Sequence, residues 1–120
     1  MEHVSGGRKM LAAAAHCGCF FGGLGFGLLP LVIWLCKSKD IFVAHHAKQA
    51  AVFQLALVPV ILLLVLALSP LIETETAAWI IVIGAGLLWM GCAILATVRA
   101  LSREYYVYPV LVPFGVKKPK

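Results

Sequence analysis

The chain has 120 residues, of which 62% are hydrophobic and 12% are charged, and it carries a net charge of +5. Soluble domains are about half apolar and a quarter charged, so this composition, with a mean hydropathy of +1.00, excludes an ordinary water-soluble domain. The length predicts one domain, residues 1–120. Because backbone groups in hydrocarbon must be satisfied within the protein, we predict an all-α integral membrane fold.

Three stretches, residues 10–36, 50–69 and 77–98, contain no Asp, Glu, Lys or Arg. Each is long enough to cross a bilayer, which needs about 20 apolar residues. We therefore predict two full transmembrane helices, at about 46–69 and 77–98, and a further N-terminal membrane segment at about 10–36.

The N-terminal segment is rich in residues that interrupt helices. Five glycines fall between Gly18 and Gly27, and Pro30 follows them. Each glycine weakens a helix by roughly 1 kcal/mol relative to alanine, and a proline removes a backbone hydrogen bond. A straight helix over residues 10–36 would also be about 40 Å long, against a hydrocarbon core of about 30 Å. These features predict that the segment is broken.

We place the break near residues 22–27, with half-helices at 9–21 and 28–36. The uninterrupted apolar run is about twice as long as the core of a secretion signal, so we expect the segment to be retained in the protein. Two arrangements remain open for it: a kinked segment that spans the membrane, and a re-entrant hairpin that enters and returns to the same side.

The basic residues bear on this choice. If the first segment spans, Arg8 and Lys9 lie on the side of Glu73 and Glu75, and the other eight basic residues lie opposite. If it is a hairpin, all ten share one side. Cytoplasmic loops carry an excess of Lys and Arg, so both arrangements place the C-terminus in the cytoplasm, and the hairpin satisfies the rule without exception.

The second membrane segment begins with a polar turn. At about 100° per residue, His45, His46, Lys48 and Gln49 fall within one arc of about 160°, while Gln54 points away from His45. An amide inside an apolar helix usually finds a partner on a neighbouring helix or in a water-filled groove, and an interhelical hydrogen bond is the simpler role for Gln54. The residues predicted to form a polar groove or interhelical contacts are His16, His46, Lys48, Gln49 and Gln54.

Small residues allow membrane helices to approach one another closely. Glycines recur at suitable spacings in the first and third segments, and this pattern predicts tight packing without naming the partner helix. The residues predicted to take part are Gly18, Gly22, Gly23, Gly27, Gly84 and Gly91.

The C-terminal tail, residues 104–120, combines tyrosines with lysines. Tyrosine side chains are enriched at the level of the lipid headgroups, and basic residues near anionic lipid contribute about 1 kcal/mol each. We predict that the tail lies along the cytoplasmic membrane surface. The residues expected at the lipid interface are Trp34, Tyr105, Tyr106, Tyr108, Lys117 and Lys118.

No pattern in the sequence indicates catalysis, so we expect neither enzyme activity nor a cofactor: the membrane segments lack carboxylates, and no nucleophile elbow or zinc-protease motif occurs. Cys17 and Cys19 diverge by about 200° on a helix, so both thiols cannot face one metal ion. His16 shares a face with Cys19, but a four-ligand site would need two more groups, which makes metal or haem binding a minor alternative. Positive-inside topology already accounts for the basic residues and argues against nucleic-acid binding.

Four short motifs occur in order over about residues 11–109. They are Ala15-His16 in the glycine-rich segment, Pro30-Leu31-Val32-Ile33-Trp34-Leu35 before Lys37 and Lys39, His46-Ala47-Lys48-Gln49-Ala50 with Phe53-Gln54, and Glu104-Tyr105-Tyr106-Val107-Tyr108-Pro109. Together they resemble a family of small bacterial membrane proteins that is grouped with the Tic-type chloroplast import-channel component and the magnetosome proteins MamF and MmsF.

The resemblance implies a bacterial inner-membrane protein without a catalytic residue set. Plant members resemble parts of an import channel, and magnetosome members are linked to crystal size and membrane organisation. Two features depart from the family pattern: residues 22–27 are denser in glycine, and His45 doubles the motif histidine. We expect a structural or accessory subunit whose partners are the lipid bilayer and either a second copy or a larger membrane complex. The alternative is a component of a translocation path or channel.

Overall fold

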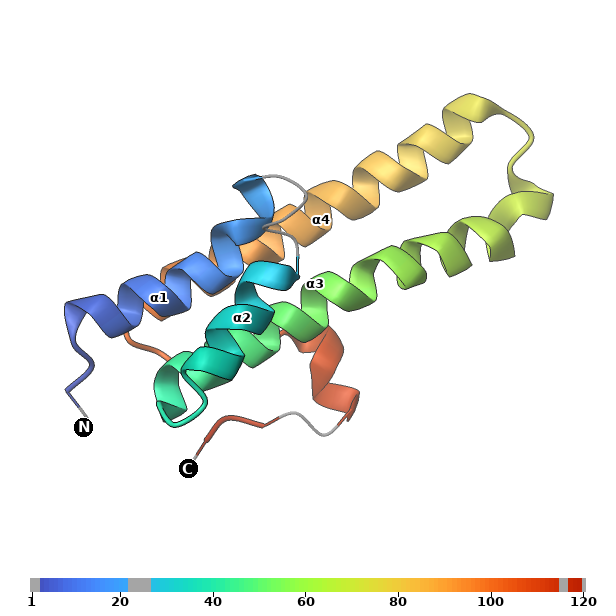
Figure 1. The fold of residues 1–120 in the computed structure, drawn as a ribbon. Coiled ribbons are helices and arrows are strands. Elements are labelled where there is room, and N and C mark those ends of the chain that lie inside the picture. Colours follow the sequence, from blue (N-terminus) through green and yellow to red (C-terminus); the bar gives the residue numbers. More distant parts are fainter. Residues whose placement is uncertain (1–2, 22–26, 115–116, 120) are drawn as a thin grey trace.

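The computed structural model describes residues 3–21, 27–114 and 117–119. These residues form helices and loops without any strand, which confirms the all-α class. The elements in chain order are α1 Gly6–Cys17, the 3-10 helix η1 Gly18–Phe21, α2 Leu28–Cys36, α3 Ile41–Leu68, the 3-10 helix η2 Ser69–Leu71, α4 Glu75–Leu101 and the 3-10 helix η3 Pro109–Phe114 (Figure 1).

Within the described residues, two helical stretches are long and apolar enough to cross a membrane, Ile41–Leu71 and Glu75–Leu101. They contain the transmembrane helices predicted at about 46–69 and 77–98. Both helices begin a few residues earlier than predicted, because side chains cap their first turns.

The two caps satisfy backbone N–H groups that have no partner inside a helix. The Asp40 carboxylate accepts a hydrogen bond from the Val43 N–H at 3.1 Å, and the Thr74 hydroxyl accepts one from the Ala77 N–H at 3.2 Å. An acidic residue at this position also interacts favourably with the positive end of the helix dipole. Asp40 therefore fixes the start of α3.

The helices α3 and α4 form a hairpin whose arms touch each other little (Figure 1). We call residues 41–54 and 89–101 the inner halves of these helices, and residues 55–68 and 75–88 the outer halves. Helix α1 packs against both α3 and α4, and α2 packs against α3. The short N-terminal helices therefore hold the inner halves together.

Alanines make this close packing possible. Ala12 and Ala15 of α1, Ala47 and Ala50 of α3 and Ala100 of α4 are completely buried. They belong to one core cluster. Small side chains let helix backbones approach closely, which is how helices associate in a membrane where burial from water contributes little.

The structure describes two helical stretches of the N-terminal segment, one on each side of the predicted break. The helical structure of α1 and η1 ends at Phe21, and α2 begins at Leu28 after Gly27. Most of the predicted break, residues 22–26, lies outside the described residues. Helices α1 and α2 run in opposite directions, so the start of α1 and the end of α2 lie at the same end of the molecule, near both termini (Figure 1).

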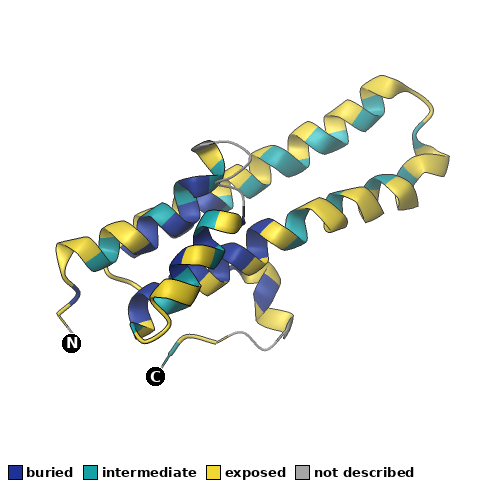
Figure 2. Cartoon of the chain, viewed as in Figure 1, coloured by how far each residue is buried: buried dark blue, intermediate teal, exposed yellow. Residues whose placement is uncertain are grey.

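The outer halves of α3 and α4 are largely exposed (Figure 2), and many of their exposed residues are large and apolar. Leu63 is 65% exposed, Leu66 59% and Leu88 73%. Large exposed apolar surfaces mark contact with a membrane or another protein. The outer halves therefore form the part of the molecule best suited to a hydrocarbon environment.

Candidate functional site

A buried polar cluster lies where α1 meets the inner halves. We define it as five side chains that are at most 2% exposed and that come from α1, α3 and the segment before η3: His16, His46, Gln49, Gln54 and Tyr108. Burying such groups costs free energy unless they are hydrogen-bonded. The hydrogen bonds of the cluster therefore decide how it is built.

Three of the side chains form a continuous chain of hydrogen bonds. The Tyr108 hydroxyl lies 2.9 Å from His16 Nδ1, and His16 Nε2 lies 2.9 Å from His46 Nδ1. His46 Nε2 then lies 3.0 Å from the backbone carbonyl oxygen of Glu104. The chain thus connects α1, α3 and the segment that follows α4.

The carbonyl at one end fixes the direction of every bond in this chain. A carbonyl oxygen only accepts, so His46 Nε2 donates to Glu104. A neutral imidazole has one donor and one acceptor nitrogen, so His46 Nδ1 accepts from His16 Nε2. His16 Nδ1 then accepts from the Tyr108 hydroxyl. With both rings neutral, His16 and His46 are each the Nε2–H tautomer.

The contact between the two rings is compatible with at most one added proton. If either imidazole is protonated, the neutral partner can still offer an acceptor nitrogen across the 2.9 Å contact between His16 and His46. If both are protonated, two N–H groups face each other and the contact becomes repulsive. Tyr108 lies outside the two membrane-spanning helices. Burial raises the pKa of its hydroxyl, so the hydroxyl stays neutral and can donate to His16.

Gln54 satisfies backbone groups on both sides of the helix break. Its Oε1 accepts a hydrogen bond from the Gly27 N–H at 2.8 Å, at the start of α2. Its Nε2 donates to the carbonyls of Ala15 at 3.1 Å and His16 at 3.3 Å, at the end of α1. Helix ends leave such groups without partners, so the buried amide of Gln54 supplies hydrogen bonds that the helices themselves cannot.

The segment after α4 is fastened to α3 by further hydrogen bonds to its backbone. Gln49 Oε1 accepts from the Tyr108 N–H at 3.3 Å, and His45 Nε2 donates to the Tyr106 carbonyl at 2.8 Å. The Tyr108 ring also stacks on Phe53 with centroids 3.8 Å apart. The prediction that Tyr108 lies at the lipid interface is wrong, because these contacts draw it into the core.

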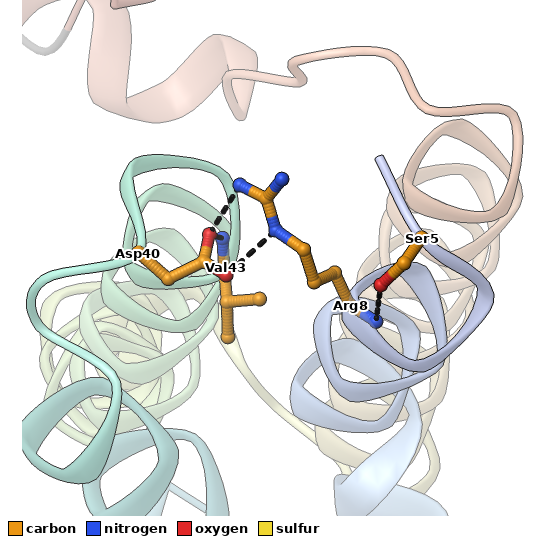
Figure 3. A network of polar contacts seen from close by, with 4 residues as sticks. All are labelled: Ser5, Arg8, Asp40 and Val43. Carbon is orange, nitrogen blue, oxygen red and sulfur yellow. Dashed lines mark hydrogen bonds and ion pairs between the residues drawn. The ribbon is translucent and has the colours of Figure 1, made fainter. Parts of the chain in front are cut away.

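An ion pair between Arg8 and Asp40 joins the first turn of α1 to the start of α3 (Figure 3). Arg8 Nε and one terminal nitrogen donate to the two carboxylate oxygens of Asp40 at 2.7 and 2.8 Å. Hydrogen bonding from Arg8 lowers the pKa of Asp40. Ser5 caps α1 and so fixes the turn that carries Arg8. The first turn of α1 is thereby joined to the first turn of α3.

The other residues predicted for the polar groove and the interface are more exposed. Lys48 is exposed and its ammonium lies 5.7 Å from the centre of the half-buried Trp34 ring. Tyr105 and Tyr106 are half-buried, while Lys117 and Lys118 are exposed. Lys48 therefore lies on the surface, apart from the buried polar cluster.

The glycines predicted to pack fall into four groups. Gly18 is buried, and Gly22 and Gly23 lie outside the described residues. Gly27 has φ = +74°, and a Cβ there would lie 2.5 Å from Leu55 Cδ2. At Gly84 and Gly91 a Cβ would meet no atom within 4 Å, so these two positions are open.

Sequence reasoning missed the contributions of Tyr108 and Asp40. The core position of Tyr108 depends on how residues after α4 fold back, a long-range feature that no local pattern reveals. The position of Asp40, directly before an apolar helix, is a recognisable N-cap signal. Its pairing with Arg8 joins residues 32 positions apart and depends on the antiparallel course of α1 and α2.

Among the described residues, no group of three or more His, Cys, Asp or Glu side chains is placed to hold a metal ion. The four cysteines, Cys17, Cys19, Cys36 and Cys92, are free thiols. The buried polar cluster thus has the chemistry of a hydrogen-bonded joint between helices.

Comparison with known proteins places the chain in a family. The sequence model of the magnetosome magnetite crystal formation protein family matches residues 7–115. The chain belongs to this family. No curated protein and no solved structure matches it. The match covers the buried polar cluster and both helices that can cross a membrane. The family match confirms the magnetosome part of the resemblance. With the two helices that can cross a membrane, it identifies the chain as a membrane protein of this family.

Proposed function

We propose that this protein is a non-catalytic structural or accessory subunit of a membrane assembly. The arrangement of the buried polar cluster supports this role, because Gln54, His16 and His46 direct their polar atoms at one another or at the chain's own backbone. Groups used in this way organise helices. The cluster accordingly holds α1, the inner half of α3 and the segment after α4 together.

The observation that carries the proposal is the open face of α4. Gly84 and Gly91 are seven residues apart and lie on one side of the helix. Neither has an atom within 4 Å of the position of a Cβ. Paired small residues are the common contact of associating membrane helices. A helix of a second copy or of a partner protein can approach α4 here.

Single substitutions Gly84→Leu and Gly91→Leu test this proposal, with Gly86→Leu as the matched control. Gly86 is equally open but lies about 200° around the helix from Gly84. We expect the wild-type protein to be captured with a partner or second copy by native mass spectrometry and by cross-linking in membranes. Both test variants should lose that species, while the control keeps it. A wild-type protein that is strictly monomeric and without partners contradicts the proposal.

The proposed assembly includes the N-terminal segment as a re-entrant hairpin. The antiparallel course of α1 and α2 supports this arrangement, as does the Arg8–Asp40 ion pair, which keeps the start of the segment beside its end. All ten basic residues then share the cytoplasmic side, in the bacterial inner membrane or a membrane derived from it. Helices α3 and α4 are the two full spans.

A translocation path is the second candidate, because the broken segment places polar groups beside two membrane-spanning helices. The same cluster weighs against it, since its side chains are at most 2% exposed and leave no open aqueous route among themselves. Liposomes containing the purified protein provide the test. Ion or peptide flux above that of protein-free liposomes would favour the path over the structural role.

A further inference from the structure

A narrow apolar groove lies between α3 and α4, mainly along their outer halves. Its volume is about 420 Å³. The wall on α3 includes Leu57, Ile61 and Leu64, and the wall on α4 includes Ala85, Leu88 and Trp89, while η3 lines the inner end. Both helices can cross a membrane, so the groove is open to hydrocarbon.

The cross-section of the groove indicates which kind of molecule can fit in it. The lining residues of α3 run from Phe53 to Leu64, which is about 16 Å along the helix axis. Counted as all the empty space that an occupant's atoms could fill, the groove holds about 910 Å³, which over that length gives a mean cross-section of about 55 Å². A helix with its side chains is at least about 10 Å across, with a cross-section near 80 Å². The groove is therefore narrower than a helix and wide enough for hydrocarbon chains.

A polar cavity of about 400 Å³ lies farther along α4, toward the basic end of the molecule. Its charged lining residues are Arg99, Glu104 and Lys118. Arg99 lies seven residues beyond Cys92, a residue of the apolar groove, and therefore on the same helix face about 10 Å away along the axis. Arg99 pairs with Glu104, and Lys118 leaves the cavity with a net positive charge.

We propose that the protein binds one anionic phospholipid, with an acyl chain in the apolar groove and the phosphate in the polar cavity. The phosphodiester oxygens accept hydrogen bonds from the Lys118 ammonium and from guanidinium donors of Arg99 that Glu104 leaves available. A cytoplasmic C-terminus places this cavity at the leaflet surface, where anionic lipid attracts basic residues. The apolar groove and the charged cavity thus recognise the two parts of one molecule.

The test uses the full chain reconstituted in vesicles of phosphatidylethanolamine and phosphatidylglycerol, then extracted in mild detergent for native mass spectrometry. We expect one phosphatidylglycerol to remain bound in preference to phosphatidylethanolamine. Ala85→Trp fills the groove and should abolish retention, while Leu87→Trp, on a face outside the groove, should leave it intact. Lys118→Gln should weaken retention roughly fivefold, and its neighbour Lys117→Gln, outside the cavity, by a much smaller factor.

Any one of three results would overturn the proposal. Equal retention of both lipids removes the anionic phosphate site, and equal effects of the groove variant and its control remove the acyl-chain site. A dimer that Ala85→Trp dissociates would show that a second copy occupies the groove. The partner contact proposed at Gly84 and Gly91 is tested by different variants, so either idea can fail without the other.

Discussion

Gln54 and Gly27 are joined by a 2.8 Å hydrogen bond that anchors the start of α2 to the middle of α3. The same side chain binds the last turn of α1 through Ala15 and His16. Backbone groups at buried helix ends must be satisfied by other protein groups or by water. The Gln54 amide supplies these hydrogen bonds, so the positions of α1 and α2 both depend on one polar side chain of α3.

Replacing Gln54 by leucine should therefore lower the free energy of unfolding by about 2 kcal/mol or more. The Gly27 N–H and the Ala15 carbonyl lose this partner at about 1–3 kcal/mol each, while the His16 carbonyl still accepts from the Cys19 thiol. Unfolding by denaturing detergent in mixed micelles measures the change. Gln49→Leu is the matched control, because Gln49 is also a buried amide of α3 but binds only the Tyr108 N–H. Equal losses for the two variants would contradict the special role of Gln54.

Substitution of Gly27 should destabilise the protein because its backbone conformation suits only glycine. Its φ of +74° is unfavourable for residues with a Cβ, and that Cβ would also press on Leu55. We expect Gly27→Ala to destabilise the protein by about 1–3 kcal/mol. Gly84→Ala is the comparison, since the position is helical and open, and it should be neutral or stabilising by about 0.5–1 kcal/mol. Thermal unfolding in detergent gives both values, and no difference between them would refute this account.

The sequence was sufficient for the features that repeat locally. Apolar length predicted α3 and α4, and Pro30 and the glycines before it predicted that α1 and α2 are separate helices. It did not determine the contacts that depend on chain folding, such as the insertion of Tyr108 between α1 and α3. Tyrosine near a membrane helix is usually interfacial, and only the hydrogen bond to His16 and the stacking on Phe53 override that preference.

The Arg8–Asp40 pair should make stability sensitive to acid. Hydrogen bonding from Arg8 lowers the pKa of Asp40 in the folded protein, whereas an unfolded aspartate titrates near pH 3.9. A lowered carboxyl pKa contributes stability that is fully present above the unfolded value and is lost as pH falls through the folded value. The free energy of unfolding should therefore drop on acidification below about pH 4.

Asp40→Asn isolates this effect, because asparagine remains a good N-cap but carries no charge to pair with Arg8. The variant should be less stable than the wild type near neutral pH and should lack the Asp40 contribution to the drop below about pH 4. Asp40→Ala also removes the cap over Val43 and should cost about 1 kcal/mol more. Identical pH dependence of the wild type and Asp40→Asn would show that the ion pair is not formed.

The bond directions in the buried polar cluster give a spectroscopic prediction. His16, His46 and His45 should each be the Nε2–H tautomer at neutral pH, because His46 and His45 donate to carbonyls of Glu104 and Tyr106. Nitrogen-15 chemical shifts of the imidazoles distinguish the two tautomers directly. Tyr108→Phe removes the donor to His16 Nδ1 and should shift that nitrogen most. An Nδ1–H tautomer at His46 would be incompatible with the chain of hydrogen bonds.

The antiparallel course of α1 and α2 leads to a decisive topology experiment. Cys36, at the end of α2, is exposed and serves as an internal reference once Cys17, Cys19 and Cys92 are replaced by serine. Thiols introduced by His3→Cys and Glu73→Cys, both at exposed positions, then report on the N-terminus and on the loop before α4. Neither substitution disturbs the caps formed by Ser5 and Thr74.

A membrane-impermeant maleimide should label the thiol at position 3 from the same side as Cys36, and the thiol at position 73 only from the opposite side. This result follows if the Arg8–Asp40 pair holds the first turn of α1 beside the start of α3. A segment that spans the bilayer would separate position 3 from Cys36 and place it with position 73. Such labelling would require the ion pair to break in the membrane, and Arg8→Gln would then leave stability unchanged.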